Sequence, residues 1–265
     1  MPDSYNPRMK FSARSHSAAG ASALALALLL ASLAAVERGA TADRPLVIGV
    51  AAGLRMPTEK AAEAYTAEMG RRIELRFGAS EDLLTRASFP QVGEATDLLL
   101  PADESYVRTA EERRLVERSR HMGTMTAVVL TSTDIRAWDD LIRAGHRVAL
   151  GQSGSAIGKL TREHLGRLDL WDGLSPHVVE TGTVTEAANA AKVKAVSAAI
   201  VWNVVAEGYP QLRAVELPEL RGCVGTVRIA VLKQSRRAAE AEAFARFAAD
   251  PARGGRFYRA AGLQP

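Results

Sequence analysis

The sequence predicts an α/β protein whose mostly parallel sheets are flanked by helices on both faces. Short apolar runs, each typical of a buried strand, alternate along the chain with longer segments of helical character. Several turns that lead from a predicted strand into a predicted helix consist of small residues. No internal repeat and no long linker interrupts the alternation, which runs from about residue 45 to the end of the chain.

Local patterns justify the individual elements. The apolar run Leu46–Ala51 predicts a buried strand. Pro57 suits the first position of a helix that reaches about Met69, because the N–H at that position has no partner within the helix. Ile73, Leu75 and Phe77 alternate with polar residues, which predicts a strand. The strands expected from residue 72 onward are 72–77, 97–100, 126–130, 147–150, 177–179, 198–201 and 227–232. The further helices expected are one that begins at Ser80, those at 102–114, 155–168 and 184–194, one near 204, and two at the end of the chain, 236–248 and 251–260.

The N-terminus has the pattern of a secretory leader. Arg8, Lys10 and Arg14 precede an apolar run at 18–36, and Ala40-Thr41-Ala42 offers a cleavage site. The alternative is a membrane anchor, because the run is almost long enough to span a bilayer. The small residues, the basic flank and the cleavage site favour a leader at residues 1–42. No cysteine lies directly after the apolar run, so we expect no lipoprotein anchor. The mature protein should be soluble outside the cytoplasm.

Charge and cysteine content exclude several classes of protein. The formal net charge is +4, and it falls to about +2 without residues 1–42, which carry four basic and two acidic side chains. With no basic block in the sequence, we expect no nucleic-acid partner. Cys223 is the single cysteine, so an intrachain disulfide and a cysteine-based metal site are excluded.

Four strand-to-helix turns carry the candidate binding groups. They are Ala51–Leu54, Gly78–Ser80, Gly151–Ser155 and Thr181–Val184. Ligands of such sheets bind at the carboxyl ends of the strands, and helix N-termini attract anions through their N–H groups and dipole. The alternative is that the serines merely cap their helices.

No catalytic constellation stands out in the sequence. The stretch 151–155 approaches the G-x-S-x-G nucleophile motif but ends in serine. The histidines after the leader, at 121, 146, 164 and 177, lack the spacing of metal ligands. We therefore expect a binding protein rather than an enzyme, with no cofactor and no protein-ligated metal ion.

Six stretches together resemble the periplasmic molybdate-binding proteins of ABC importers, over nearly all of residues 45–262. They are VIGVAAGL, ELRFGAS, ATDLLLPADESYV, AWDDLIRAGHRVALG, LWDGLSPHVVETGTVTEAANA and AAIVW. The resemblance implies a two-lobed periplasmic-binding-protein-like fold, with lobe one at 45–125 plus 228–265 and lobe two at 126–227. It also implies a tetrahedral dianion held in the interlobe cleft by N–H groups and hydroxyls, a permease partner in the inner membrane, and a monomer.

Carried over residue by residue, the resemblance gives a mixed ligand set. Ser80 and Val184 match the family pattern. Gly53 stands where the family has a serine, and Trp202 where it has a tyrosine. The loop after Leu150 is one residue shorter, so the ligand position there falls on Ile157 or, with a shifted turn, on Ser155 or Ala156.

Arg55 could compensate for the missing hydroxyls, because a guanidinium binds an oxyanion through two parallel hydrogen bonds. Its alternative role is that of an exposed loop arginine. We expect an oxyanion ligand, with molybdate or tungstate favoured. Three alternatives remain: a sensory or scaffold module of the same fold, a different anion, and another ligand such as an organic acid or ferric iron.

Overall fold

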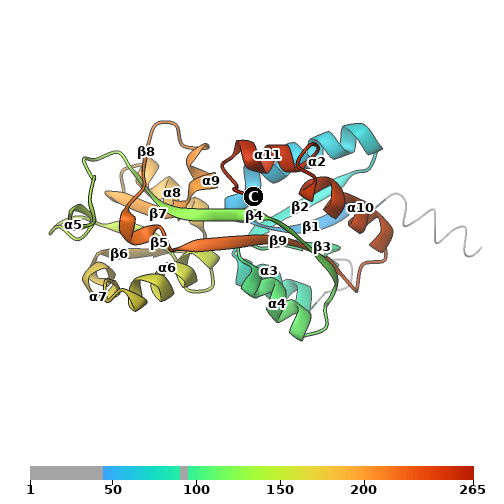
Figure 1. The fold of residues 1–265 in the computed structure, drawn as a ribbon, viewed down its shortest axis with the longest axis horizontal. Helices are drawn as coiled ribbons and strands as arrows, with labels where there is room; N and C mark the ends of the chain where they lie inside the picture. Colours follow the sequence, from blue (N-terminus) through green and yellow to red (C-terminus); the bar gives the residue numbers. More distant parts are fainter. Residues whose placement is uncertain (1–43, 90–94) are drawn as a thin grey trace, which may run out of the picture. The chain divides into compact units, whose positions relative to one another are not determined.

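The computed structural model describes residues 44–89 and 95–265 (Figure 1). The predicted leader at 1–42 lies outside the described residues. Within the described residues, no helix is both long enough and apolar enough to cross a membrane.

The strands and helices alternate along the chain as the sequence predicts. The strands are β1 Leu46–Ala51, β2 Ile73–Gly78, β3 Leu98–Leu100, β4 Val116–Thr131, β5 Val148–Gly151, β6 Val178–Thr181, β7 Ala198–Trp202, β8 Arg213–Val215 and β9 Val224–Leu232. The α-helices are α2 Arg55–Met69, α3 Ser80–Ser88, α4 Glu104–Glu112, α5 Trp138–Leu141, α6 Ala156–Arg167, α7 Trp171–Leu174, α8 Val184–Lys192, α9 Asn203–Ala206, α10 Ala238–Ala249 and α11 Gly255–Ala260. Three 3₁₀ turns among the described residues are η1 Ala52–Leu54, η2 Ser175–His177 and η3 Pro218–Leu220.

Within the described part of the chain, the strands form a nine-stranded sheet in the order β2-β1-β3-β9-β4-β7-β5-β6, with β8 beside β4. The strands β2, β1 and β3 are parallel, as are β7, β5 and β6. The antiparallel pair β4 and β9 joins the two parallel groups and runs through the middle of the sheet (Figure 1). This arrangement confirms the predicted α/β class.

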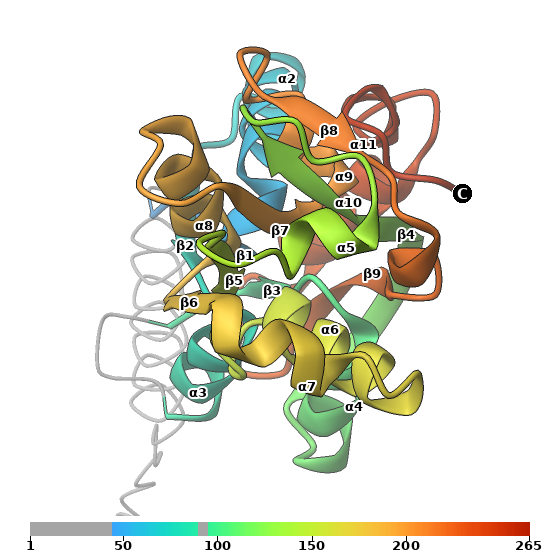
Figure 2. The same cartoon turned by 90° about the vertical axis from the view of Figure 1, so that its left-hand side faces the viewer.

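Helices cover both faces of the sheet. Helices α3, α4, α6 and α7 lie on one face, and α2, α8 and α11 lie on the other (Figure 2). Burial follows from this layering: every residue of β1, β3, β5 and β7 is buried. These strands are continuous apolar runs because both of their faces contact helices rather than water.

Strand register brings the four small-residue turns together in two pairs. In one parallel group Ala51 at the end of β1 pairs with Gly78 at the end of β2. In the other, Gly151 at the end of β5 pairs with Thr181 at the end of β6. Because parallel strands end at the same edge of a sheet, the helices that follow them begin side by side.

Strand β4 begins ten residues before the predicted start at 126. Its first half, VERSRHMGTM, is mostly polar and only partly buried, so it lacks the apolar pattern that predicts a strand. It is a strand because it pairs with β9, through a register shift between His121 and Gly123. Gly123 has a φ of +144°, and a Cβ there would lie 2.2 Å from the carbonyl oxygen of Gln264, so a side chain does not fit.

Other boundaries also differ from the sequence prediction. Helix α2 begins at Arg55, so Pro57 is its third residue rather than its first. The position is tolerated because the first N–H groups of a helix have no partner inside it. The short elements β8, α5 and α7 were not expected, since three or four residues are too few to show a period.

Candidate functional site

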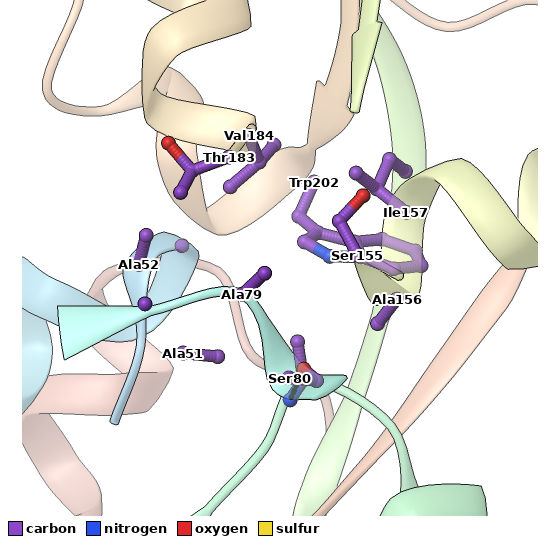
Figure 3. A pocket seen from close by; sticks show the side chains of 13 residues that line it. Ala51, Ala52, Ala79, Ser80, Ser155, Ala156, Ile157, Thr183, Val184 and Trp202 are labelled. Atoms are coloured by element: carbon purple, nitrogen blue, oxygen red, sulfur yellow. Dashed lines mark hydrogen bonds between the residues drawn. The ribbon is translucent and has the colours of Figure 1, made fainter. Parts of the chain in front are cut away.

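A cavity of about 240 Å³, its open mouth included, lies where the two pairs of turns meet (Figure 3). We call it the first cavity. No charged side chain lines it. Its lining consists of Ala51, Ala52, Gly53, Gly78, Ala79, Ser80, Ala102, Ser155, Ala156, Ile157, Thr183, Val184 and Trp202.

The first residues of three helices line this cavity. Ser80 begins α3, Ala156 and Ile157 begin α6, and Val184 begins α8. The first N–H groups of a helix have no acceptor within that helix, and they carry the positive end of its dipole. Because no carboxylate lines the space where these three helices begin, their N–H groups can bind an anion there.

Ser80 is placed to donate a hydrogen bond into the cavity. It is 2% exposed, and its Oγ accepts the N–H of Ala102 at 3.1 Å. The residue that caps α3 is Ala79, so Ser80 does not serve as the cap. Ala102 takes one lone pair of the hydroxyl, and among the described residues no acceptor takes its proton, which is therefore available for a ligand.

Ser155 has a different role from Ser80. Its Oγ donates to the carbonyl of Gln152 at 2.8 Å and accepts the N–H of Gly158 at 3.1 Å. It is therefore the N-cap of α6, as the alternative interpretation of the sequence held. Since its proton is already engaged, the groups that this turn can offer are the N–H groups of Ala156 and Ile157.

Thr183 caps α8 and was not among the predicted site residues. Its Oγ1 accepts the N–H of Glu186 at 3.2 Å, and its side chain lines the first cavity beside Val184. Among the described residues no acceptor takes its hydroxyl proton, which can therefore be donated. The candidate turn Thr181–Val184 includes Thr183, but nothing in the sequence singles it out, because a threonine before a helix is commonly a simple cap.

Gly53 and Trp202 occupy adjoining space in the wall of the cavity. A Cβ at Gly53 would lie 3.1 Å from Val184 Cγ1 and 3.3 Å from Trp202 Cδ1. Trp202 is 1% exposed, and its indole nitrogen lies on the edge of the ring that faces the cavity (Figure 3). No acceptor among the described residues takes the indole N–H. The tryptophan thus fills the space that a side chain at 53 would need, and it brings a donor of its own.

Hydrogen bonds join the walls of the cavity. Thr185 Oγ1 donates to the carbonyl of Ala52 at 3.3 Å. The carbonyl of Gly154 accepts both the N–H of Glu81 at 3.2 Å and the phenol of Tyr106 at 3.2 Å. Burial raises the pKa of Tyr106, so its phenol stays protonated and remains a donor. These bonds connect segments far apart in sequence around one space.

Arg55 is not brought to the first cavity. Its guanidinium lies over the ring of Phe77, 3.6 Å from the centroid, and pairs with Glu59 at 3.3 Å. It lines a separate space, the second cavity, together with Met56, Lys192 and Tyr209. Of the predicted site residues, Gly53, Ser80, Ser155, Ile157, Val184 and Trp202 line the first cavity and Arg55 does not.

The described residues contain no cluster of three or more His, Cys, Asp or Glu side chains able to hold a metal ion. Cys223 is buried, with its Sγ 3.6 Å from Thr161 Oγ1. Burial raises the pKa of its thiol to about 11. The groups near the first cavity are therefore hydrogen-bond donors and small apolar side chains rather than metal ligands.

Solved structures of similar fold include binders of different solutes. The periplasmic molybdate-binding protein of Azotobacter vinelandii is 17% identical, with a TM-score of 0.70 over 83% of this chain and 99% of that chain. The sulfate-binding protein SubI of Mycobacterium tuberculosis is 19% identical, with a TM-score of 0.71 over 83% and 86%. Iron-bound HitA of Pseudomonas aeruginosa is 16% identical, with a TM-score of 0.63 over 82% and 84%. At these identities the similarity shows the fold alone.

No curated protein sequence matches the chain significantly. The family model for bacterial extracellular solute-binding proteins, in contrast, matches residues 46–264. That match includes nearly all of the described residues, and with them every turn that lines the first cavity. The chain belongs to the bacterial extracellular solute-binding protein family.

Proposed function

We propose that this protein binds a tetrahedral oxyanion, molybdate or tungstate, in the first cavity and delivers it to an ABC permease in the inner membrane. It does so as a monomer outside the cytoplasm, after removal of the leader. One observation carries the proposal: the N-termini of α3, α6 and α8 meet at a cavity whose lining has no carboxylate and no other charged side chain.

The donors available there suit a fully deprotonated anion. The Ser80 and Thr183 hydroxyls and the Trp202 indole can donate, in addition to first-turn N–H groups. A helix N-terminus favours negative charge without a counter-cation. The predicted ligand positions Gly53, Ile157 and Val184 would contribute backbone N–H groups, and Ser155 would hold the turn that presents Ile157.

The lining of the first cavity disfavours two other inorganic solutes, hydrogen phosphate and iron. Hydrogen phosphate carries a proton that needs an acceptor, and no carboxylate, the strongest acceptor among side chains, lines the cavity. Iron requires carboxylate, phenolate or imidazole ligands, and no such side chain lines the cavity. Molybdate, tungstate and sulfate carry no proton at neutral pH and need only donors.

Size limits the ligand further. Pockets for drug-sized organic ligands measure about 300–1,000 Å³. The first cavity leaves only about 20 Å³ to a water-sized sphere, so it is far too small for such ligands and suits a small inorganic anion. The sequence resemblance to molybdate-binding proteins is the reason for preferring molybdate and tungstate to sulfate.

A thermal-shift panel confirmed by calorimetry tests the proposal. The ligands are molybdate, tungstate, sulfate, phosphate and a set of small carboxylates. A ligand that binds only the folded state adds about 2.7 kcal/mol of stability at a hundredfold excess over Kd. We expect molybdate and tungstate to raise the melting temperature and phosphate to have no effect. A shift with sulfate alone would mean that sulfate, rather than molybdate or tungstate, is the ligand. No shift with any oxyanion would refute the proposal.

A further inference from the structure

The second cavity is separate from the first and larger. It has about 570 Å³ of space where the first has about 240 Å³ by the same measure. The start of α2 forms one side, and α8, α9 and the turn after α9 form the other. Ala52 and Gly53 line both cavities, so the two spaces share a wall.

The charged side chains that line the second cavity are both cations, Arg55 and Lys192. The guanidinium of Arg55 forms an ion pair with the carboxylate of Glu59 on the same helix, with 3.3 Å between Nη1 and Oε1. Lys192 lies in the last turn of α8 and forms no ion pair with any described residue. No carboxylate lines this cavity, so an anion would meet attraction without a competing acidic group.

The side-chain amide of Asn189 adds a hydrogen-bond donor to the second cavity. The phenol of Tyr209 donates to Asn189 Oδ1 at 2.9 Å, and burial raises the pKa of Tyr209, so the phenol stays protonated. The same phenol also lies 3.3 Å from the carbonyl of Thr185, its second acceptor. Among the described residues no acceptor takes the NH₂ group of Asn189, which can therefore donate to a ligand. Asn189 and Lys192 are three residues apart on α8 and therefore lie on the same face of the helix.

The remaining lining is apolar. Met56, Val204 and Val205 contribute hydrocarbon and thioether surface, and Val204 and Val205 are buried. A Cβ at Gly208 would lie 2.9 Å from Met56 Sδ, so the glycine leaves the space that the methionine occupies. A cavity lined by two cations, an amide and apolar side chains matches an anion with a short hydrocarbon chain.

We propose that the second cavity binds a small organic carboxylate. Lys192 and Asn189 hold the carboxylate group, Arg55 adds positive charge, and Met56, Val204 and Val205 contact the chain. This proposal is independent of the first cavity, because none of these residues lines it. A ligand here would contact both α2 and α8, and the first residue of α8, Val184, lines the first cavity.

The test is a titration of the purified protein with pentanoate, followed by amide nuclear magnetic resonance. Butylammonium, a probe of similar length and opposite charge, is the ligand control. The variants are Lys192→Gln and Lys194→Gln. Lys194 follows the same helix but does not line the cavity, so its replacement removes the same charge from nearby. A parallel titration with molybdate reports on the first cavity.

We expect pentanoate to shift the signals of Asn189, Lys192 and Gly208 with saturation in the millimolar range, and butylammonium not to. Loss of a hydrogen bond to a charged group predicts a Kd about tenfold higher in Lys192→Gln, with Lys194→Gln unchanged. The molybdate titration should be the same in both variants. Absence of saturable shifts, shifts confined to Ser80 and Ile157, or equal weakening by both variants would overturn the proposal.

Discussion

Trp202 lies where it would contact any side chain at position 53: its Cδ1 is 3.3 Å from the Cβ that an alanine there would carry. Val184 Cγ1 and Val205 Cγ2 lie 3.1 Å and 3.4 Å from the same point. The two departures from the sequence pattern of molybdate-binding proteins, Gly53 and Trp202, are therefore linked through shared space. With the indole buried at 202, a Cβ at 53 would make tighter contacts than usual, so glycine suits that position.

Gly53→Ala should destabilise the fold by about 1–3 kcal/mol, because the added methyl group crowds the packed side chains of Val184 and Trp202. Chemical denaturation measures the loss. Gly166→Ala is the control: nothing lies within 4 Å of the new Cβ in helix α6, so it should stabilise by about 0.5–1 kcal/mol. In a Val184→Ala background Gly53→Ala should cost less by at least about 0.5 kcal/mol. Strict additivity would show that the contact with Val184 is not responsible.

Ser80→Ala should weaken binding of the oxyanion by roughly 1.5–3 kcal/mol, the contribution of a hydrogen bond to a charged group. Stability should also fall by about 1 kcal/mol or more, because the buried N–H of Ala102 loses its acceptor. Calorimetric titration and denaturation separate the two effects. Ser88→Ala removes a hydroxyl from the other end of α3 and should leave affinity unchanged. Equal affinities of Ser80→Ala and the parent protein would exclude Ser80 as a ligand.

Ser155→Ala should give the opposite pattern. The hydroxyl caps α6 and has no proton to spare, so its loss should cost about 1 kcal/mol of stability. Affinity for the anion should change much less than in Ser80→Ala, once both variants are measured well below their melting temperatures. A loss of affinity as large as that of Ser80→Ala would mean that the Ser155 hydroxyl turns toward the ligand.

Trp202→Phe keeps an aromatic ring in the wall but removes the indole N–H. If that group donates to the anion, affinity should fall by roughly 1.5–3 kcal/mol. Trp171→Phe is the matched control, since Trp171 stacks with Arg162 and lines neither cavity. Quenching of tryptophan fluorescence by the anion should disappear in Trp202→Phe and persist in the control. Persistence in both variants would place the indole N–H away from the ligand.

Cys223 should make the fold sensitive to alkali. Burial raises the pKa of its thiol from 9.0 in the unfolded chain to about 11 in the fold, so the folded state holds the proton more tightly. This contribution is fully present below pH 9 and is lost as the pH rises from 9 to 11. One pKa unit corresponds to about 1.4 kcal/mol, so the loss approaches about 3 kcal/mol.

Urea unfolding of Cys223→Ala and the parent protein from pH 8 to pH 11 measures this effect. Tyr106 and Tyr258 also have raised pKa values through burial, but they remain in both proteins. The difference between the two proteins should therefore shrink or reverse with rising pH. A difference that stays constant across this range would show that the thiol does not titrate separately in the two states.

The sequence by itself determined the alternation of strands and helices and the turns where a ligand could bind. Runs such as Leu46–Ala51 are apolar throughout because both of their faces are buried, and that pattern is visible without a structure. The start of helix α3 at Ser80 is visible in the same way, because a turn of small residues, Gly78–Ser80, precedes a segment of helical character. The polar first half of β4 was missed because pairing with β9, rather than its own pattern, makes it a strand.

The tertiary structure decided which of these local features share one space. Strand register sets Ala51 beside Gly78 and Gly151 beside Thr181, and no local pattern contains that information. The tertiary structure also gives the two serines different roles: the Ser155 hydroxyl donates to Gln152, whereas the Ser80 hydroxyl donates to no described residue. It places Arg55 at a different cavity. Local sequence fixes where a helix begins because caps and periods act over a few residues. Pairing between distant strands decides what that helix end faces, because it depends on contacts across the whole chain.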